Sequence, residues 1–138
     1  MLLRKDVKLE LLKKVPLFSR CSKPSLEDIA AIADEIDLPD GRVLMTEGER
    51  GREFFVLVQG EVDVTKGGEH VRTLSAGEFF GEIALISDEP RTATVTAKGP
   101  IRVLVITDRA FKALVERSPG IEAEVQEAAA ERTGADDL

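Results

Sequence analysis

The sequence contains one cysteine, one histidine, and neither tryptophan nor tyrosine among its 138 residues. The lone Cys21 cannot form a disulfide within the chain, and its simplest role is that of a small, partly buried side chain. One histidine and one cysteine cannot supply the ligand clusters that typify metal sites in small barrels. We therefore expect no bound metal, and we interpret His70, which follows two glycines and a glutamate, as a hairpin-tip residue.

Long apolar segments are also absent. No run of consecutive apolar residues exceeds five, whereas a membrane-spanning helix needs about 20. The first residues, Met1 to Asp6, lack the apolar segment and the small-residue cleavage site of a secretion signal. The sequence thus predicts a cytoplasmic chain that makes no membrane contact of its own.

An excess of basic residues is missing as well. The formal net charge is −7, with 19 Lys and Arg against 26 Asp and Glu. Nucleic-acid surfaces depend on clustered Lys and Arg that neutralise phosphates, so we expect no nucleic-acid partner. Any anionic ligand must be held by local geometry rather than by the overall charge.

The N-terminal region has the pattern of helices. Residues 4–15 carry apolar side chains four positions apart, and Pro16 should end that helix. Ser22 followed closely by Pro24 marks the start of a second helix, whose apolar stripe continues to Ile36. We therefore assign residues 1–36 to N-terminal helices.

Residues 37–107 have a different pattern, in which glycine and proline separate short segments rich in Val, Phe, Thr and Ile. The segment from Phe54 to Val58 indicates a buried strand, and Gly67-Gly68 marks a hairpin turn. Many short strands with such punctuation are typical of a barrel or sandwich.

Helical spacing returns after Thr107, and Ser118-Pro119 begins a last helix. Residues 108–134 are assigned to these C-terminal helices and 135–138 to a frayed tail. The length and the hydrophobic fraction of 43% predict one domain, residues 1–138. The expected fold class is mainly β with flanking helices (α+β), an antiparallel β-roll or jelly-roll barrel with N-terminal helices and two C-terminal helices.

Residues 80–95 are too short for a domain helix and too apolar for a plain loop. Gly81 begins one helical turn, in which the amides of Ile83, Ala84 and Leu85 would have no earlier carbonyl to bond. Such a turn binds anions, and a glycine at its start lets a phosphate approach the backbone. The planar guanidinium of Arg91 can hold two phosphate oxygens at once.

Glu82 would repel a phosphate unless it faces another part of the ligand. A carboxylate accepts a charge-assisted hydrogen bond from a sugar hydroxyl, a bond that contributes about 1.5–3 kcal/mol. A phosphate and a free 2′-hydroxyl on one small ligand describe a 3′,5′-cyclic nucleotide. The surrounding residues include no legible pair of nucleophile and base, so we expect a binding module and not an enzyme.

The stretch Phe-Gly-Glu, an aliphatic turn, a short loop and Pro-Arg-Thr-Ala-Thr-Val closely resembles the phosphate-binding cassette of cyclic-nucleotide-binding domains. Residues 48–62 resemble the early strands of that family, and the similarity covers almost the whole chain. The resemblance implies that Glu82 binds the ribose 2′-hydroxyl and Arg91 the cyclic phosphate. It further implies phosphate contacts from the amides of Gly81, Ile83 and Ala84 and from the hydroxyl of Thr92.

The base has three candidate contacts. Val64 and Val71 are apolar walls for it, although strand residues facing a barrel interior are more often core than ligand contacts. Residues 130–134 resemble the last helix of the ligand domain in bacterial cyclic-nucleotide-gated potassium channels, where an arginine at the position of Arg132 stacks on the purine. The alternative for Arg132 is a solvated side chain at a helix end.

The resemblance implies a cyclic-nucleotide sensor whose last helix moves on binding to control an effector, such as a channel or an enzyme. We favour cAMP over cGMP, although Thr92 is compatible with both, and we expect no cofactor. A channel domain would lie at the cytoplasmic face of the membrane. We expect a monomer or weak homodimer.

Two rival functions remain. A transcription regulator like the catabolite activator protein, without its DNA-binding part, shares the ligand domain. However, residues 119–138 carry six acids and one base, and such a segment would repel DNA. A scaffold that has lost its ligand would not need Gly81, Glu82 and Arg91 together.

Overall fold

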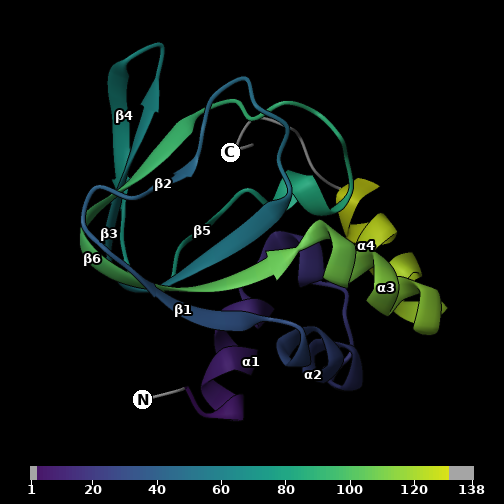
Figure 1. Cartoon of the computed structure of the whole chain (residues 1–138). Helices are drawn as coiled ribbons and strands as arrows, with labels where there is room; N and C mark the ends of the chain where they lie inside the picture. The colour runs from purple at the N-terminus through teal and green to yellow at the C-terminus, as the bar shows by residue number, and fades with distance from the viewer. Residues whose placement is uncertain (1–2, 131–138) are drawn as a thin grey trace.

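The computed structural model describes residues 3–130 and places the strands of this part of the chain in one antiparallel sheet, with the helices gathered at one end (Figure 1). The predicted fold class is therefore confirmed. Within the described residues the sheet has six strands in the order β1-β6-β3-β4, with β2 paired to β6 and β5 paired to β3. The elements in chain order are α1 (Lys5–Lys13), η1 (Pro16–Phe18), α2 (Lys23–Ala31), β1 (Asp34–Leu38), β2 (Val43–Met45), β3 (Glu53–Lys66), β4 (Glu69–Leu74), β5 (Phe79–Phe80), η2 (Glu82–Leu85), β6 (Thr94–Thr107), α3 (Asp108–Arg117) and α4 (Pro119–Ala130).

The long strand β3 supplies two hydrophobic cores. Successive side chains of a strand point to opposite faces. Phe54 and Val56 belong to the core shared with the helices, whereas Phe55 and Leu57 belong to the core inside the barrel. The continuous apolar run of this strand is explained by burial on both faces.

Helices α2 and α3 begin at the capping residues that the sequence predicted. The Ser22 hydroxyl accepts a hydrogen bond from the Ser25 amide at the start of α2, and the Thr107 hydroxyl accepts one from the Ala110 amide at the start of α3. In residues 3–130 no helix combines the length and the apolar composition that a membrane crossing requires.

The assignment of residues 1–36 to helices is wrong at the C-terminal end of each of the two helices. α1 ends at Lys13, and Pro16 begins the short helix η1 instead of terminating α1. α2 ends at Ala31, and residues 34–38 form β1, which pairs antiparallel with β6. Apolar spacing alone favoured a longer helix, but the hydrogen-bond ladder with β6 outweighs that local pattern.

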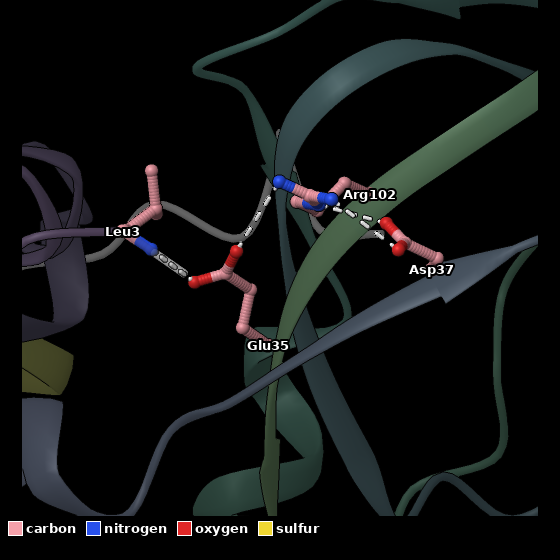
Figure 2. A network of polar contacts seen from close by, with 4 residues as sticks. All are labelled: Leu3, Glu35, Asp37 and Arg102. Carbon is pink, nitrogen blue, oxygen red and sulfur yellow. Dashed lines mark hydrogen bonds and ion pairs between the residues drawn. The ribbon is translucent and has the colours of Figure 1, made fainter. Parts of the chain in front are cut away.

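A polar network joins the start of the chain to the sheet (Figure 2). The Leu3 amide donates to Glu35 Oε1 at 2.7 Å, and Glu35 Oε2 lies 3.6 Å from Arg102 Nη1. Arg102 Nε also donates to Asp37 Oδ1 at 2.7 Å, and this bond holds the pKa of Asp37 below its ordinary value. The Glu35 side chain is only 3% exposed, so the network fixes the entry to α1 against β1 and β6.

Gly60 allows β3 to bend where the pairing register with β6 shifts. Its φ is 91°, a left-handed conformation that favours glycine. A Cβ at this position would lie 2.7 Å from the Pro100 carbonyl oxygen and 2.9 Å from Ile101 Cγ2. Both the backbone conformation and the close approach therefore require glycine.

We predict that Gly60→Ala lowers the free energy of unfolding by about 2 kcal/mol or more, because strain and a steric contact add. Gly120→Ala in α4 is the matched control, since a Cβ there meets nothing within 4 Å, and it should be neutral or stabilising by up to about 1 kcal/mol. Urea unfolding monitored by circular dichroism measures both variants. Equal effects of the two substitutions would contradict the role of Gly60.

Candidate ligand-binding site

Gly81 links β5 to the single turn η2 and adopts a left-handed conformation with φ of 82°. The preceding Phe80 is fully buried and stacks on Phe55 of β3 with ring centroids 5.1 Å apart. This packing holds the start of the turn against the sheet. The helical turn predicted to begin at Gly81 is therefore present.

One predicted property of the turn is wrong. The Ala84 amide donates to the Gly81 carbonyl at 3.2 Å, so it already has a partner within the turn. The reason is that η2 is a 3₁₀ helix, in which each amide bonds the carbonyl three residues earlier, not four. The amides of Glu82 and Ile83 precede this first bond.

The Arg91 side chain is 7% exposed and lies between two backbone carbonyls. Nη2 donates to the Glu53 carbonyl at 2.7 Å and Nη1 to the Gly81 carbonyl at 3.3 Å. Burial lowers the pKa of the guanidinium, and the nearby Glu53 carboxylate opposes that change. Arginine remains protonated in proteins, so a buried positive charge stands at the start of η2.

Two glycines make room for this guanidinium. A Cβ on Gly51 would lie 2.7 Å from Arg91 Cζ, and one on Gly81 would lie 2.8 Å from Nη1. The backbone of Arg91 is also fixed, because its amide donates to the Glu49 carbonyl and its carbonyl accepts from the Gly48 amide. The segment 48–51 therefore positions Arg91 through both its backbone and its side chain.

A hollow of about 240 Å³ opens beside this turn. Gly81 and Glu82 line it, whereas Arg91 is not a lining residue and is connected to it through the hydrogen bond that it donates to the Gly81 carbonyl. Glu82 is 7% exposed, so its carboxyl group is also largely shielded from water. The remaining lining residues are Pro16, Arg72, Leu74, Glu78, Phe79 and Phe80.

Comparison with known proteins identifies the family of the chain. The family model of the cyclic nucleotide-binding domain matches residues 35–118. The chain belongs to the cyclic nucleotide-binding domain family. The resemblance inferred from the cassette is thus confirmed, and the site lies in a regulatory module of the kind that this family provides.

Curated relatives place such modules in larger proteins. The chain is 41% identical over 122 residues to a cAMP-dependent protein kinase regulatory subunit of Mycosarcoma maydis, covering 80% of this chain and 23% of that protein. It is 37% identical over 125 residues to a cyclic nucleotide-gated potassium channel of Rhizobium etli, covering 91% of this chain and 35% of the channel. The chain therefore spans about a quarter to a third of the length of these relatives.

A solved structure has the same fold. The N-terminal domain of a transcriptional regulator from Streptomyces coelicolor superposes with a TM-score of 0.78 at 24% identity, covering 88% of this chain and 89% of that domain. The β-roll with flanking helices is therefore an arrangement that this chain shares with a solved protein.

The predicted site residues are only partly brought together. Gly81, Glu82, Ile83 and Ala84 lie on or next to η2, and the Gly81 carbonyl accepts a hydrogen bond from Arg91. Thr92 follows Arg91 in the chain and is exposed. Arg132 lies outside the described residues.

The two valines predicted to face the base differ strongly. Val64 is 0% exposed and belongs to the barrel core, which is the alternative that the sequence left open. Val71 is 50% exposed. The pairing of β3 with β4 passes from Val64–Arg72 to Thr65–His70, so Val71 is the extra residue of a β-bulge.

Sequence reasoning missed two groups of residues. Arg72 and Leu74, two positions apart on β4, line the hollow, but the bulge that sets this face leaves no mark in the apolar pattern. Gly51 lies in the segment that resembles the early strands of the family, and nothing in the sequence links it to Arg91. The similarity of residues 48–62 to the family was the one signal in the sequence that could have identified Gly51 as a functional residue.

We predict that Gly51→Ala lowers the free energy of unfolding by about 1–2 kcal/mol, because the new methyl group displaces the pinned Arg91 guanidinium. The same substitution in an Arg91→Ala background should cost much less, since the clash is gone. A double-mutant cycle by urea unfolding measures this coupling. Additive effects would show that Gly51 and Arg91 do not constrain each other.

Proposed function

We propose that this chain is a cyclic-nucleotide sensor in which Arg91 binds the cyclic phosphate and Glu82 the ribose 2′-hydroxyl, with cAMP as the main ligand. The observation that carries the proposal is the buried Arg91 guanidinium hydrogen-bonded to the carbonyl of Gly81, which lines the same hollow as Glu82. Two of its N–H groups donate to backbone carbonyls, and an arginine has five, so donors remain for phosphate oxygens.

The neighbouring groups suit the remaining contacts of the phosphate and sugar. Gly81 leaves the backbone open to a phosphate, with the Ile83 and Ala84 amides as further donors, although the Ala84 amide would have to share its hydrogen bond to Gly81. The exposed Thr92 hydroxyl adds another. Around the base, the candidates are Val71, Arg132 and Val64, and of these Val64 belongs to the barrel core. No covalent chemistry is required of any of them, so the domain regulates and does not catalyse.

The module passes the binding event to an effector through its C-terminal helix. A ligand can shift this equilibrium only by binding one conformation more tightly than the other. A channel or an enzyme is the favoured effector, because the relatives include a potassium channel and a kinase regulatory subunit.

We further propose that residues 1–138 act as one domain, as a monomer or weak homodimer, with no nucleic-acid partner. Within α4 the exposed Glu122 and Glu127 would repel DNA, which disfavours the transcription-regulator alternative.

We predict that Arg91→Ala weakens cAMP binding by several kcal/mol, roughly a hundredfold or more, because the phosphate loses its charged partner in a shielded site. Arg109→Ala on the exposed face of α3 is the matched control and should leave affinity unchanged. Isothermal titration calorimetry gives the affinities, and circular dichroism shows whether the fold persists. Equal affinity of Arg91→Ala and the parent chain would refute the phosphate assignment.

One observation favours cGMP as a second candidate ligand. Arg72 lines the hollow on the β4 side. An arginine fork matches the O6 and N7 acceptors of guanine, whereas adenine presents N7 and an N6 amino donor at the same edge. The arginine would therefore attract guanine more strongly than adenine if the base lies against β4.

We predict that Arg72→Ala lowers affinity for cGMP by about tenfold or more while changing affinity for cAMP by less than about threefold, because only guanine loses paired acceptor contacts. Competition of both nucleotides against a fluorescent cAMP analogue measures the two affinities. An equal loss for both ligands would mean that Arg72 contributes to the sugar-phosphate contacts or to local structure and does not read the base.

A further inference from the structure

Glu124 of α4 binds the start of α2, about a hundred residues earlier in the chain. Its Oε2 accepts from the Ser22 amide at 3.0 Å and its Oε1 accepts from the Ser25 hydroxyl at 2.7 Å. The first turn of a helix carries amides without helical partners and a partial positive charge, so it favours a carboxylate. This paired contact joins the last described helix to the second.

The same part of α4 is packed into the helical core. Ile121 and Val125 are buried in one cluster with Leu17 and Phe18 of η1, and α4 packs directly against η1. The first residue of η1, Pro16, lines the hollow beside Glu82. A continuous set of contacts therefore runs from the hollow through η1 and α4 to α2.

We propose that Glu124 is a latch that holds α4 against α2 and so keeps the Pro16 wall of the hollow in place, which couples ligand occupancy to the position of α1, η1 and α2. The coupling rests on the proposed function, whereas the latch itself does not. The first turns of α4 and the first helices then move together, so an effector can receive the signal at α1 as well as beyond α4.

The native Cys21 reports the state of this latch. The thiol lies beside the contact, and burial together with the Glu124 charge raises its pKa to about 12. A thiolate, not a thiol, is alkylated. Cys21 is half-buried, so opening of the latch exposes it further and speeds its alkylation, and it is the single cysteine of the chain.

Two variants separate charge from contact. Glu124→Gln removes the charge and one acceptor. Ser25→Ala leaves the charge near Cys21 and removes the hydroxyl that donates to Glu124 and accepts from the Ser22 hydroxyl. Glu127→Gln, at an exposed position of the same helix, is the control. Each variant is made in the full chain, alkylated with iodoacetamide at mildly alkaline pH without ligand, and titrated with cAMP by calorimetry.

Both latch variants should speed alkylation about threefold or more and weaken cAMP binding about three- to tenfold, because part of the population lacks the preformed wall. Saturating cAMP should slow alkylation of the parent chain, and Glu127→Gln should change neither rate nor affinity. Ser25→Ala, at a helix start near the surface, carries the test if Glu124→Gln does not fold.

Unchanged alkylation in Ser25→Ala would overturn the latch. Faster alkylation with unchanged or tighter cAMP binding would overturn the coupling while the proposed function stands. If the parent chain binds neither cAMP nor cGMP, the proposed function fails and the coupling with it, and the ligand-free alkylation rates still decide whether Glu124 holds α4 to α2.

Discussion

The site depends on one buried cation held by two backbone carbonyls. Arg91 donates to the carbonyls of Gly81 and Glu53, and through them it joins the start of η2 to the start of β3. A guanidinium can do this without losing its charge, because it has several donors in a fixed plane. Gly51 and Gly81 leave room for the planar guanidinium, because a Cβ at either position would clash with it.

In a chain of net charge −7, an anion can be bound only if the groups nearest to it outweigh the overall negative charge. Exposed charges are screened beyond about 8 Å at physiological ionic strength, so distant carboxylates have little influence at the hollow. The few groups at the turn act in a shielded environment, where both attraction and repulsion are stronger than in water. Under the proposed function, the same shielding would require Glu82 to face a sugar hydroxyl and not the phosphate.

The strands and the turn could be predicted because their causes are local. Gly81 is needed where the chain reverses into η2, and the alternation around Val62 and Val64 follows from a sheet with one face inside the barrel. Gly51, β1 and the lining residue Arg72 could not be predicted in the same way. Their roles depend on a side chain 40 positions away, on pairing with β6, and on a bulge in β4, and none of these leaves a periodic signal. The hydrogen bond of the Ala84 amide within the turn could not be predicted either, because the sequence does not distinguish a 3₁₀ turn from an α-helical one.

Because β3 contributes to both hydrophobic cores, it affects how the molecule unfolds. Neighbouring residues of this strand, Phe54 and Phe55, belong to the helical core and to the barrel core respectively. Withdrawing the strand from one layer necessarily removes it from the other. We therefore expect the helices and the barrel to lose their structure in one cooperative transition, and smaller rearrangements of the helices to occur by sliding over an intact strand.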